Sequence, residues 1–333
     1  MKKNEKVYSP DSISAFVRQF QGIRVLLTAY ELDIFSQLDN SALTSIQVAE
    51  KISTDPRATD RLLNALCVLG FLVKKDSKFS NTHESGEYLV RGKPGYMGGL
   101  MHQVHLWDTW TSLTECVEKG TSVINRPENV NERGPGWLQS FIAAMHYRAK
   151  NNASEIIARI NLKNVTKVLD VGGGSGIYAM AFVNAGDNIT ATVFDLPNVI
   201  PITEEYIKKE NFVGKINTAM GDYTIDNLPI GYDLVFLSAI IHSNSYEGNQ
   251  DLVRKCAGSL NPGGRIIIKD QVMEDSRIKP ARGALFALNM LVGTAAGDTY
   301  TEKEIKEWFD HTGFRFEEKI EITGEDSMMI GRI

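Results

Sequence analysis

The stretch VLDVGGGSG, residues 168–176, joins a short apolar run to five residues of which four are glycine. The next segment, IYAMAFVNA at 177–185, has the apolar character of a buried helix. A glycine turn between a strand and a helix lets a ligand approach the backbone, whose N–H groups then serve as hydrogen-bond donors. The stretch therefore predicts the first strand, turn and helix of a ligand-binding α/β sheet.

Short apolar runs recur after this stretch at intervals that suit helical crossovers between parallel strands. Two C-terminal runs, 314–322 and 326–333, alternate like strands and flank the turn TGED. We predict an α/β fold with a Rossmann-like, mostly parallel sheet that closes with an antiparallel hairpin. The further parallel strands are expected in ATVFD from residue 191, INTAM from 216, DLVFLSA from 233 and RIIIKD from 265.

Two classes of cofactor compete for the glycine turn. The dinucleotide fingerprint GxGxxG would need glycine at Ile177, whereas the glycines fall as GxGxG at residues 172, 174 and 176. This spacing weakens the NAD interpretation.

Acidic residues stand at three successive strand ends, Asp170, Asp195 and Asp222. In a parallel sheet such ends meet at one edge, where Asp195 is placed to accept hydrogen bonds from ribose hydroxyls. Asp222 and Tyr223 can meet an adenine amino group and ring face. We favour a nucleoside-containing cofactor over the alternative that these acids only cap helices.

The N-terminal part of the chain has a helical pattern. Residues 13–38 repeat apolar positions at intervals of three and four, and shorter helical stretches follow at 44–52 and 56–69. Residues 71–82, FLVKKDSKFSNT, indicate a hairpin. Helices followed by a hairpin are the order of a winged helix, which serves either DNA binding or a protein interface.

Charge favours the interface. Lys and Arg number 36 against 41 Asp and Glu, a net charge of -5, and the second short helix offers only Arg57 and Arg61 to a phosphate backbone. Residues 13–38 carry more apolar surface than one small domain covers. We therefore expect a homodimer through this domain and no nucleic-acid partner.

No segment has the pattern of a secretion signal or a membrane span. Residues 1–12 are charged and then polar, and nowhere do ~18 apolar residues run uninterrupted. Cys67, Cys116 and Cys256 lie among apolar neighbours and are expected as buried free thiols in a reducing compartment. We expect a cytoplasmic protein without membrane contact.

The length of 333 residues favours two domains. We place a winged-helix-like dimerisation domain at 1–100 and a cofactor-binding domain with acceptor-lining helices at 101–333. The Pro/Gly/Asn-rich loop NRPENVNERGPGW, 125–137, marks a boundary or a lid, and a helix is predicted over 138–159.

Six motifs follow one another along the chain: VLDVGGGSG, VFDLP, GDYT, AIIH, LNPGGRIIIKD and GDTYTEKEIKEWFDHTGF. In this order they resemble the class I S-adenosylmethionine (SAM) methyltransferases, and among them the small-molecule O-methyltransferases with an N-terminal winged-helix dimerisation domain. The resemblance covers nearly the whole chain.

The resemblance implies where the cofactor binds. The glycine turn would face the amino acid part of SAM, Asp195 the ribose, and Asp222 with Tyr223 the adenine. The cofactor-binding residues expected on this basis are Asp170, Gly172, Gly174, Gly176, Asp195, Leu196, Asp222, Tyr223 and Ser238.

His242 ends the motif AIIH after the fourth strand and matches the catalytic base of the family by position. Histidine changes its charge near neutral pH, so it can take the proton of an acceptor hydroxyl, although a capping or satisfied polar histidine is the plainer alternative. Asp270, at the end of RIIIKD, matches the acid that orients this base.

Two positions depart from the family pattern. Asn244 stands where tryptophan is common, and Thr299 stands where a further acidic helper is expected. Acceptors at carbon, nitrogen or sulfur, or a weakly assisted hydroxyl, therefore stay open.

The acceptor pocket is expected to mix aromatic, thioether and polar side chains, which suits a flat, partly apolar ligand. For each of these residues the alternative is a place in the core. The candidates are Trp107, Trp110, Phe141, Met145, His146, Phe286, Asn289 and Met290.

His102 and His105 form an HxxH pair without further nearby ligands, so we expect a polar helix face and no metal. Two functions compete overall. The first is a SAM-dependent methyltransferase that acts on the hydroxyl of a small, planar acceptor. The second is a SAM-responsive winged-helix regulator without turnover.

Overall fold

A computed structural model describes residues 8–124, 136–322 and 326–333. The chain forms two compact units, residues 1–106 and 107–333, which are called here the N-terminal and the C-terminal unit. The helix α6 (Leu100–Trp110) crosses this division. The predicted domain boundary after residue 100 lies close to it in sequence.

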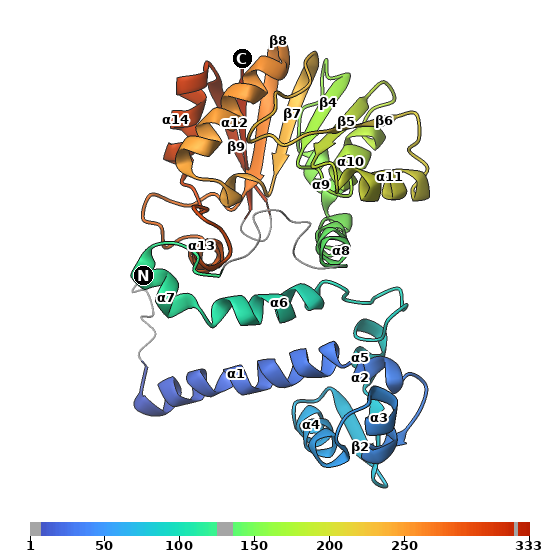
Figure 1. Ribbon diagram of the computed structural model, residues 1–333. Coiled ribbons are helices and arrows are strands. Elements are labelled where there is room, and N and C mark those ends of the chain that lie inside the picture. The colour runs from blue at the N-terminus through green and yellow to red at the C-terminus, as the bar shows by residue number, and fades with distance from the viewer. Residues whose placement is uncertain (1–7, 125–135, 323–325) are drawn as a thin grey trace, which may run out of the picture. The chain divides into compact units, whose positions relative to one another are not determined.

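The N-terminal unit has the helix and hairpin order expected of a winged helix (Figure 1). A short strand that the sequence did not predict, β1, pairs antiparallel with β3, so the hairpin becomes a sheet of order β1-β3-β2. The elements are α1 (Pro10–Glu31), α2 (Ile34–Gln37), β1 (Leu43–Thr44), α3 (Ser45–Ile52), α4 (Pro56–Val68), β2 (Leu72–Lys75), β3 (Lys78–Asn81) and α5 (His83–Tyr88).

Local signals set the helix starts in this unit. Thr44 and Gln47 form a capping box at α3, and the Asp55 side chain accepts the Ala58 N–H at the start of α4. The core of the unit gathers apolar residues of α1 to α4 and the hairpin, including the fully buried Phe79.

The C-terminal unit is built on a seven-stranded sheet of order β6-β5-β4-β7-β8-β10-β9. The five strands β4, β5, β6, β7 and β8 run parallel, and β10 pairs antiparallel with both β8 and β9. This arrangement confirms the predicted fold class. The strands are β4 (Lys167–Val171), β5 (Thr190–Asp195), β6 (Ile216–Met220), β7 (Tyr232–Ser238), β8 (Leu260–Asp270), β9 (Arg315–Glu321) and β10 (Ser327–Arg332).

Helices cover both faces of this sheet, α10 and α11 on one and α12 and α14 on the other (Figure 1). The remaining helical elements of the unit supply its N-terminal part and the segments after β7 and β8. These elements are α7 (Leu113–Lys119), α8 (Trp137–Lys150), α9 (Ala153–Ala158), α10 (Ile177–Asn184), α11 (Ile200–Lys209), η2 (Ile241–Ser243), α12 (Tyr246–Ser259), α13 (Ala281–Gly293) and α14 (Glu302–Thr312).

Strand residues alternate between two hydrophobic cores. Val168 and Phe236 pack with α9 and α10, whereas Leu169 and Val235 pack with α12 and α14. Because side chains alternate along a strand, a parallel strand with both faces covered is apolar at every position. This explains why the strands appear in the sequence as continuous apolar runs.

Three predicted elements have clearly different bounds. The helical stretch at 13–38 is divided into α1 and α2. The helix predicted over 138–159 is two helices, α8 and α9, separated by Asn151 and Asn152, because asparagine side chains compete for backbone hydrogen bonds within helices. β8 begins at Leu260, five residues before the predicted run, because Leu260 pairs with Tyr232 of β7 across an irregular register.

Some predictions fall outside or beside what the structure describes. The loop at 125–135 and the turn at 323–325 lie outside the described residues. Cys116 and Cys256 are buried free thiols, whereas Cys67 is only partly buried, so its predicted burial was wrong in degree because its side of α4 is not fully covered. Among the described residues, no helix is both long and apolar enough to cross a membrane.

Candidate functional site

The predicted site residues gather where the parallel strands end. Strand order runs outward from β4 to β5 and β6 and then returns to β7 beside β4, so the crevice between β4 and β7 is the switch point of the sheet. A side chain at Gly172 would collide with Ile240, so the loops after these two strands touch. Ligands of open α/β sheets bind at such points.

The glycine turn after β4 needs glycine for two reasons. Gly172, Gly174 and Gly176 have φ of 67°, 55° and 74°, in the left-handed region where other residues are strained. At Gly173 an added Cβ would lie 2.6 Å from Asp170 Oδ2, so the obstacle is steric. Four of the five residues of the turn therefore lack a side chain that could keep a ligand from the backbone. Gly173 packs directly against the carboxylate of Asp170.

Asp195, at the end of β5, accepts two backbone hydrogen bonds. Its Oδ2 accepts the Gly174 N–H at 2.8 Å and its Oδ1 accepts the Leu196 N–H at 2.7 Å. Burial raises the pKa of Asp195, against the opposing effect of these two bonds. Each carboxylate oxygen retains a second lone pair, as a ribose with two hydroxyl donors requires.

Asp170 is 1% exposed, and its Oδ2 has no hydrogen-bond partner. Burial first and the charge of Asp195 second raise the pKa of Asp170 to about 7. A buried acid with one unpartnered oxygen beside a second acid favours a cationic ligand, because a positive charge relieves both effects. SAM carries a sulfonium and an ammonium group, so this edge fits the predicted cofactor.

The loop after β6 presents Asp222 and Tyr223. Asp222 Oδ1 accepts from the N–H and the hydroxyl of Thr224 at 2.9 and 2.7 Å, which fixes the turn and leaves Oδ2 for an amino group. Burial raises the pKa of Tyr223 to about 12, so its hydroxyl keeps its proton and donates to Asn244 Oδ1 at 3.1 Å. Ser238 lies half-buried at the end of β7.

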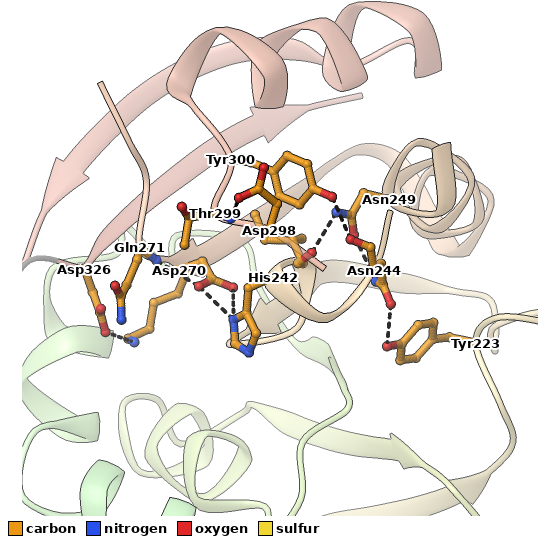
Figure 2. A network of polar contacts seen from close by, with 12 residues as sticks. Tyr223, His242, Asn244, Asn249, Asp270, Gln271, Asp298, Thr299, Tyr300 and Asp326 are labelled. Carbon is orange, nitrogen blue, oxygen red and sulfur yellow. Dashed lines mark hydrogen bonds and ion pairs between the residues drawn. The ribbon is translucent and has the colours of Figure 1, made fainter. Parts of the chain in front are cut away.

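His242 and Asp270 form a pair beside this edge (Figure 2). His242 Nδ1 lies 3.0 and 2.9 Å from the two carboxylate oxygens of Asp270, whose side chain is 5% exposed. Although burial alone would raise it, the nearby imidazole and the Gln271 N–H hold the pKa of Asp270 below its ordinary value. An ionised Asp270 favours the tautomer with hydrogen on Nδ1, which leaves Nε2 as the proton acceptor.

Several predicted acceptor-lining residues lie close to this pair. The ring of Phe286 on α13 meets His242 edge-on, with centroids 4.9 Å apart. One turn further along α13, Asn289 Oδ1 accepts the Trp110 indole N–H at 3.0 Å. Met290, the next residue, is buried. Phe286 therefore lies against His242, and the amide of Asn289 follows one turn along the same helix.

Other predicted lining residues have different neighbours. His146 Nδ1 lies 2.9 Å from the hydroxyl of Ser175 in the glycine turn, and its ring stacks on Tyr206 at 4.4 Å. Burial lowers the pKa of His146. Phe141 stacks on Trp137 at 5.2 Å. Trp107 and Met145 are half-buried.

The two atypical positions have definite partners. Asn244 bonds Tyr223 and donates to Asn249, a fully buried residue of α12 that sequence reasoning missed. Thr299 is buried and its hydroxyl donates to Gly283 O at 3.3 Å. The polar segment SNSYEGNQ gave no signal for Asn249, because a helix amide is buried only by its tertiary neighbours.

His102 and His105 lie on α6. Within residues 8–124, 136–322 and 326–333, no group of three or more His, Cys, Asp or Glu side chains has an arrangement that could hold a metal ion.

Comparisons with known proteins identify the family of the chain. The family model for the O-methyltransferase domain matches residues 120–315, and that for the O-methyltransferase dimerisation domain matches 16–91. A 3-hydroxy-5-methyl-1-naphthoate 3-O-methyltransferase of Streptomyces sahachiroi is 31% identical over 295 residues, covering 87% of this chain and 85% of that protein.

Two further proteins are similar over the whole length. TcmO of Streptomyces glaucescens, a tetracenomycin polyketide synthesis 8-O-methyl transferase, is 28% identical, covering 100% of this chain and 99% of that protein. The solved structure "PigF with SAH", a protein of Serratia, shares the fold with a TM-score of 0.89 at 23% identity, covering 98% and 100% of the two chains.

The matches of both family models and the relative above 30% identity confirm the predicted family, the enzyme class and the cofactor SAM. They favour an enzyme over a regulator without turnover. This chain therefore belongs to the S-adenosylmethionine-dependent O-methyltransferases with an N-terminal dimerisation domain.

Proposed function

We propose that this enzyme methylates a hydroxyl group of a small, aromatic or planar acceptor, with His242 as general base. The observation that carries the proposal is the contact of His242 Nδ1 with both oxygens of Asp270 at 3.0 and 2.9 Å. This contact supports different roles for the two ring nitrogens, orientation for Nδ1 and proton acceptance for Nε2.

Asp270 acts as the positioning residue for His242. A carboxylate whose pKa is held low stays ionised, so it stabilises the imidazolium that forms when Nε2 takes the hydroxyl proton. The remaining rate enhancement comes from alignment and from exclusion of water.

The cofactor site rests on the strand ends described above. SAM supplies an electrophilic methyl group on a sulfonium. The turn at 172–176 would hold the amino acid part over Asp170, Asp195 would accept from the ribose, and Asp222 with Tyr223 would meet the adenine. The orphaned Oδ2 of Asp170 and the glycine-only turn support this placement.

The acceptor class follows from the base side of the site. Phe286 beside His242 offers an aromatic wall, and Asn289 with Trp110 offers polar groups for orientation. The relatives named above are a naphthoate O-methyltransferase and a tetracenomycin O-methyl transferase, both named for fused-ring compounds. These observations favour a hydroxylated planar ring over an aliphatic acceptor.

The test is a comparison of His242→Ala and Asp270→Asn with the wild type, using hydroxylated naphthoates and related phenols. We expect His242→Ala to lower turnover by ~100- to 10,000-fold while S-adenosylhomocysteine (SAH) affinity stays nearly intact, and Asp270→Asn to cause a smaller loss. His311→Ala, at the exposed end of α14, is the matched control.

Each alternative has its own outcome in this test. Methyl transfer to carbon, nitrogen or sulfur, identified by mass spectrometry of the product, would contradict the hydroxyl acceptor. SAH binding without turnover on any acceptor would favour a regulator. Near-normal turnover by His242→Ala would contradict the proposal that His242 is the general base.

We also propose that the chain is a homodimer through its N-terminal unit. The dimerisation-domain match covers 16–91, and α1 presents an exposed apolar stripe with the spacing of one helix face. The stripe consists of Ile13, Phe16, Val17, Phe20 and Ile23, each at least 51% exposed.

A further inference from the structure

A chain of hydrogen bonds leads from Tyr223 to the turn that carries His242 (Figure 2). The Tyr223 hydroxyl donates to Asn244 Oδ1 at 3.1 Å, and Asn244 Nδ2 donates to Asn249 Oδ1 at 2.9 Å. Asn249 Nδ2 then donates to the backbone oxygen of Ile241 at 2.8 Å. Ile241 begins η2 and directly precedes His242.

The direction of this chain is fixed from its far end. A backbone oxygen only accepts, so Asn249 must turn its Nδ2 towards Ile241 and its Oδ1 towards Asn244. Asn244 must then present its Nδ2 to Asn249, which leaves its Oδ1 for the Tyr223 hydroxyl. With its pKa raised to about 12, that hydroxyl is a donor at neutral pH, so all three bonds are consistent with one arrangement.

Asn244 is held through its backbone as well. The Tyr300 hydroxyl donates to Asn244 O at 2.6 Å, and the Tyr300 ring packs edge-on against the fully buried Trp308 at 4.8 Å. Asn249 itself is fully buried. Asn244 therefore lies between two rigid supports, Tyr300 and Asn249. Its side chain can transmit a displacement rather than absorb it.

The tryptophan expected at position 244 could not make this link. An indole donates one N–H and accepts nothing, whereas the link needs one acceptor and one donor on the same side chain. An amide of this length supplies both.

From this geometry we infer that Asn244 is a positioning residue that couples the adenine end of the cofactor site to the placement of His242. A ligand that fixes the Tyr223 ring also fixes its hydroxyl, and through Asn244 and Asn249 it holds the backbone of η2. The inference rests on the proposed role of His242 as general base. It adds that cofactor binding helps to order that base.

The experiment compares Tyr223→Phe, Asn244→Ala and the double variant with the wild type. Tyr223→Phe removes one oxygen and keeps the ring, so it tests the link even if Asn244→Ala fails to fold. The readouts are hydrogen exchange of the backbone at 239–245 with and without SAH, SAH affinity by calorimetry, and kcat.

We expect SAH to slow exchange at 239–245 in the wild type and to do so markedly less in both single variants. SAH affinity should change by less than about threefold, because no cofactor contact is removed. We expect kcat to fall by ~10- to 100-fold through misplacement of the base. The double variant should lose little more than Asn244→Ala, since both substitutions break one link.

Tyr246→Phe is the matched control. Like Tyr223→Phe, it removes only a phenolic hydroxyl and keeps the ring, which packs on Trp308. The Tyr246 hydroxyl donates to Glu307 at 3.0 Å, outside the link. This variant should retain the wild-type exchange pattern and kcat.

Unchanged kcat and unchanged protection in Tyr223→Phe and Asn244→Ala, with His242→Ala inactive, would overturn the coupling and leave the general base standing. If His242→Ala is active instead, the proposed function fails, and the exchange data still decide whether Asn244 joins the cofactor site to η2.

Discussion

Asp170 shows how one buried acid makes stability depend on pH. Its pKa of about 7 lies above the value near 4 of an aspartate in an unfolded chain. Between these two values the folded state binds more protons than the unfolded state, so stability falls as pH rises through this window. The effect is complete once pH exceeds the folded pKa.

We predict that Asp170→Asn, which imitates the protonated carboxyl, flattens this fall in the cofactor-free protein. Each pKa unit corresponds to ~1.4 kcal/mol, so the wild type should lose a few kcal/mol relative to the variant between about pH 4 and about pH 8. Urea midpoints across this range measure it, with the exposed Asp187→Asn as control. Parallel curves for wild type and Asp170→Asn would contradict the raised pKa.

A substitution of Asp195 tests the proposed cofactor site. Asp195→Ala removes the proposed acceptor of two ribose hydroxyls, which should weaken SAH binding by roughly 1.5 to 3 kcal/mol or more, since the acceptor is charged. Calorimetry with SAH and with NAD is the measurement. Unchanged SAH affinity would refute the ribose assignment, and NAD binding would refute the distinction drawn from the glycine spacing.

The turn between β4 and α10 requires glycine at several positions. We predict that Gly173→Ala abolishes measurable SAH binding or displaces the turn, because the new Cβ would lie 2.6 Å from Asp170 Oδ2 and 3.0 Å from Val193 Cγ1. Calorimetry with SAH and a thermal midpoint separate loss of binding from loss of fold.

The control for this prediction is another glycine. A Cβ added at Gly258, within α12, would have no other atom within 4 Å. Gly258→Ala should therefore stabilise the protein by roughly 0.5 to 1 kcal/mol and leave SAH affinity unchanged. If both variants behave alike, the crowding at Gly173 is not the cause.

At the scale of the whole molecule, the exposed stripe of α1 predicts the oligomeric state. Obligate interfaces commonly bury more than ~2,000 Å² and resemble a core cut in half. We predict that Phe16→Glu gives a monomer, because it places a charge in the middle of the stripe, whereas Ala15→Glu, on the opposite side by helical spacing, keeps the dimer.

Light scattering at micromolar concentration distinguishes one chain of 37.0 kDa from two. A monomeric wild type would contradict the homodimer. A dimer that persists in Phe16→Glu would place the interface elsewhere.

Most of the fold could be predicted from the sequence, because most strands and helices have local sequence patterns that identify them. Continuous apolar runs, helical periodicity and the glycine turn placed every strand of the large sheet within a few residues. Two features were not predicted, the early start of β8 in this sheet and the two-residue β1 in the sheet of the N-terminal unit. They owe their strand character to pairing with β7 and β3. Pairing partners lie outside any sequence window.

The site divides in the same way. Positions after successive strand ends follow from topology, so Asp170, Asp195, Asp222 and His242 could be assigned to one edge from the sequence alone, and the family resemblance added Asp270. The partners of individual side chains depend on the tertiary packing, such as Asn244 with Tyr223, 21 residues away, and His146 with Ser175, 29 residues away. Spacing along a chain fixes which face or edge a residue occupies, but a hydrogen bond forms within 3.5 Å and in one direction, and only the packed neighbours set both.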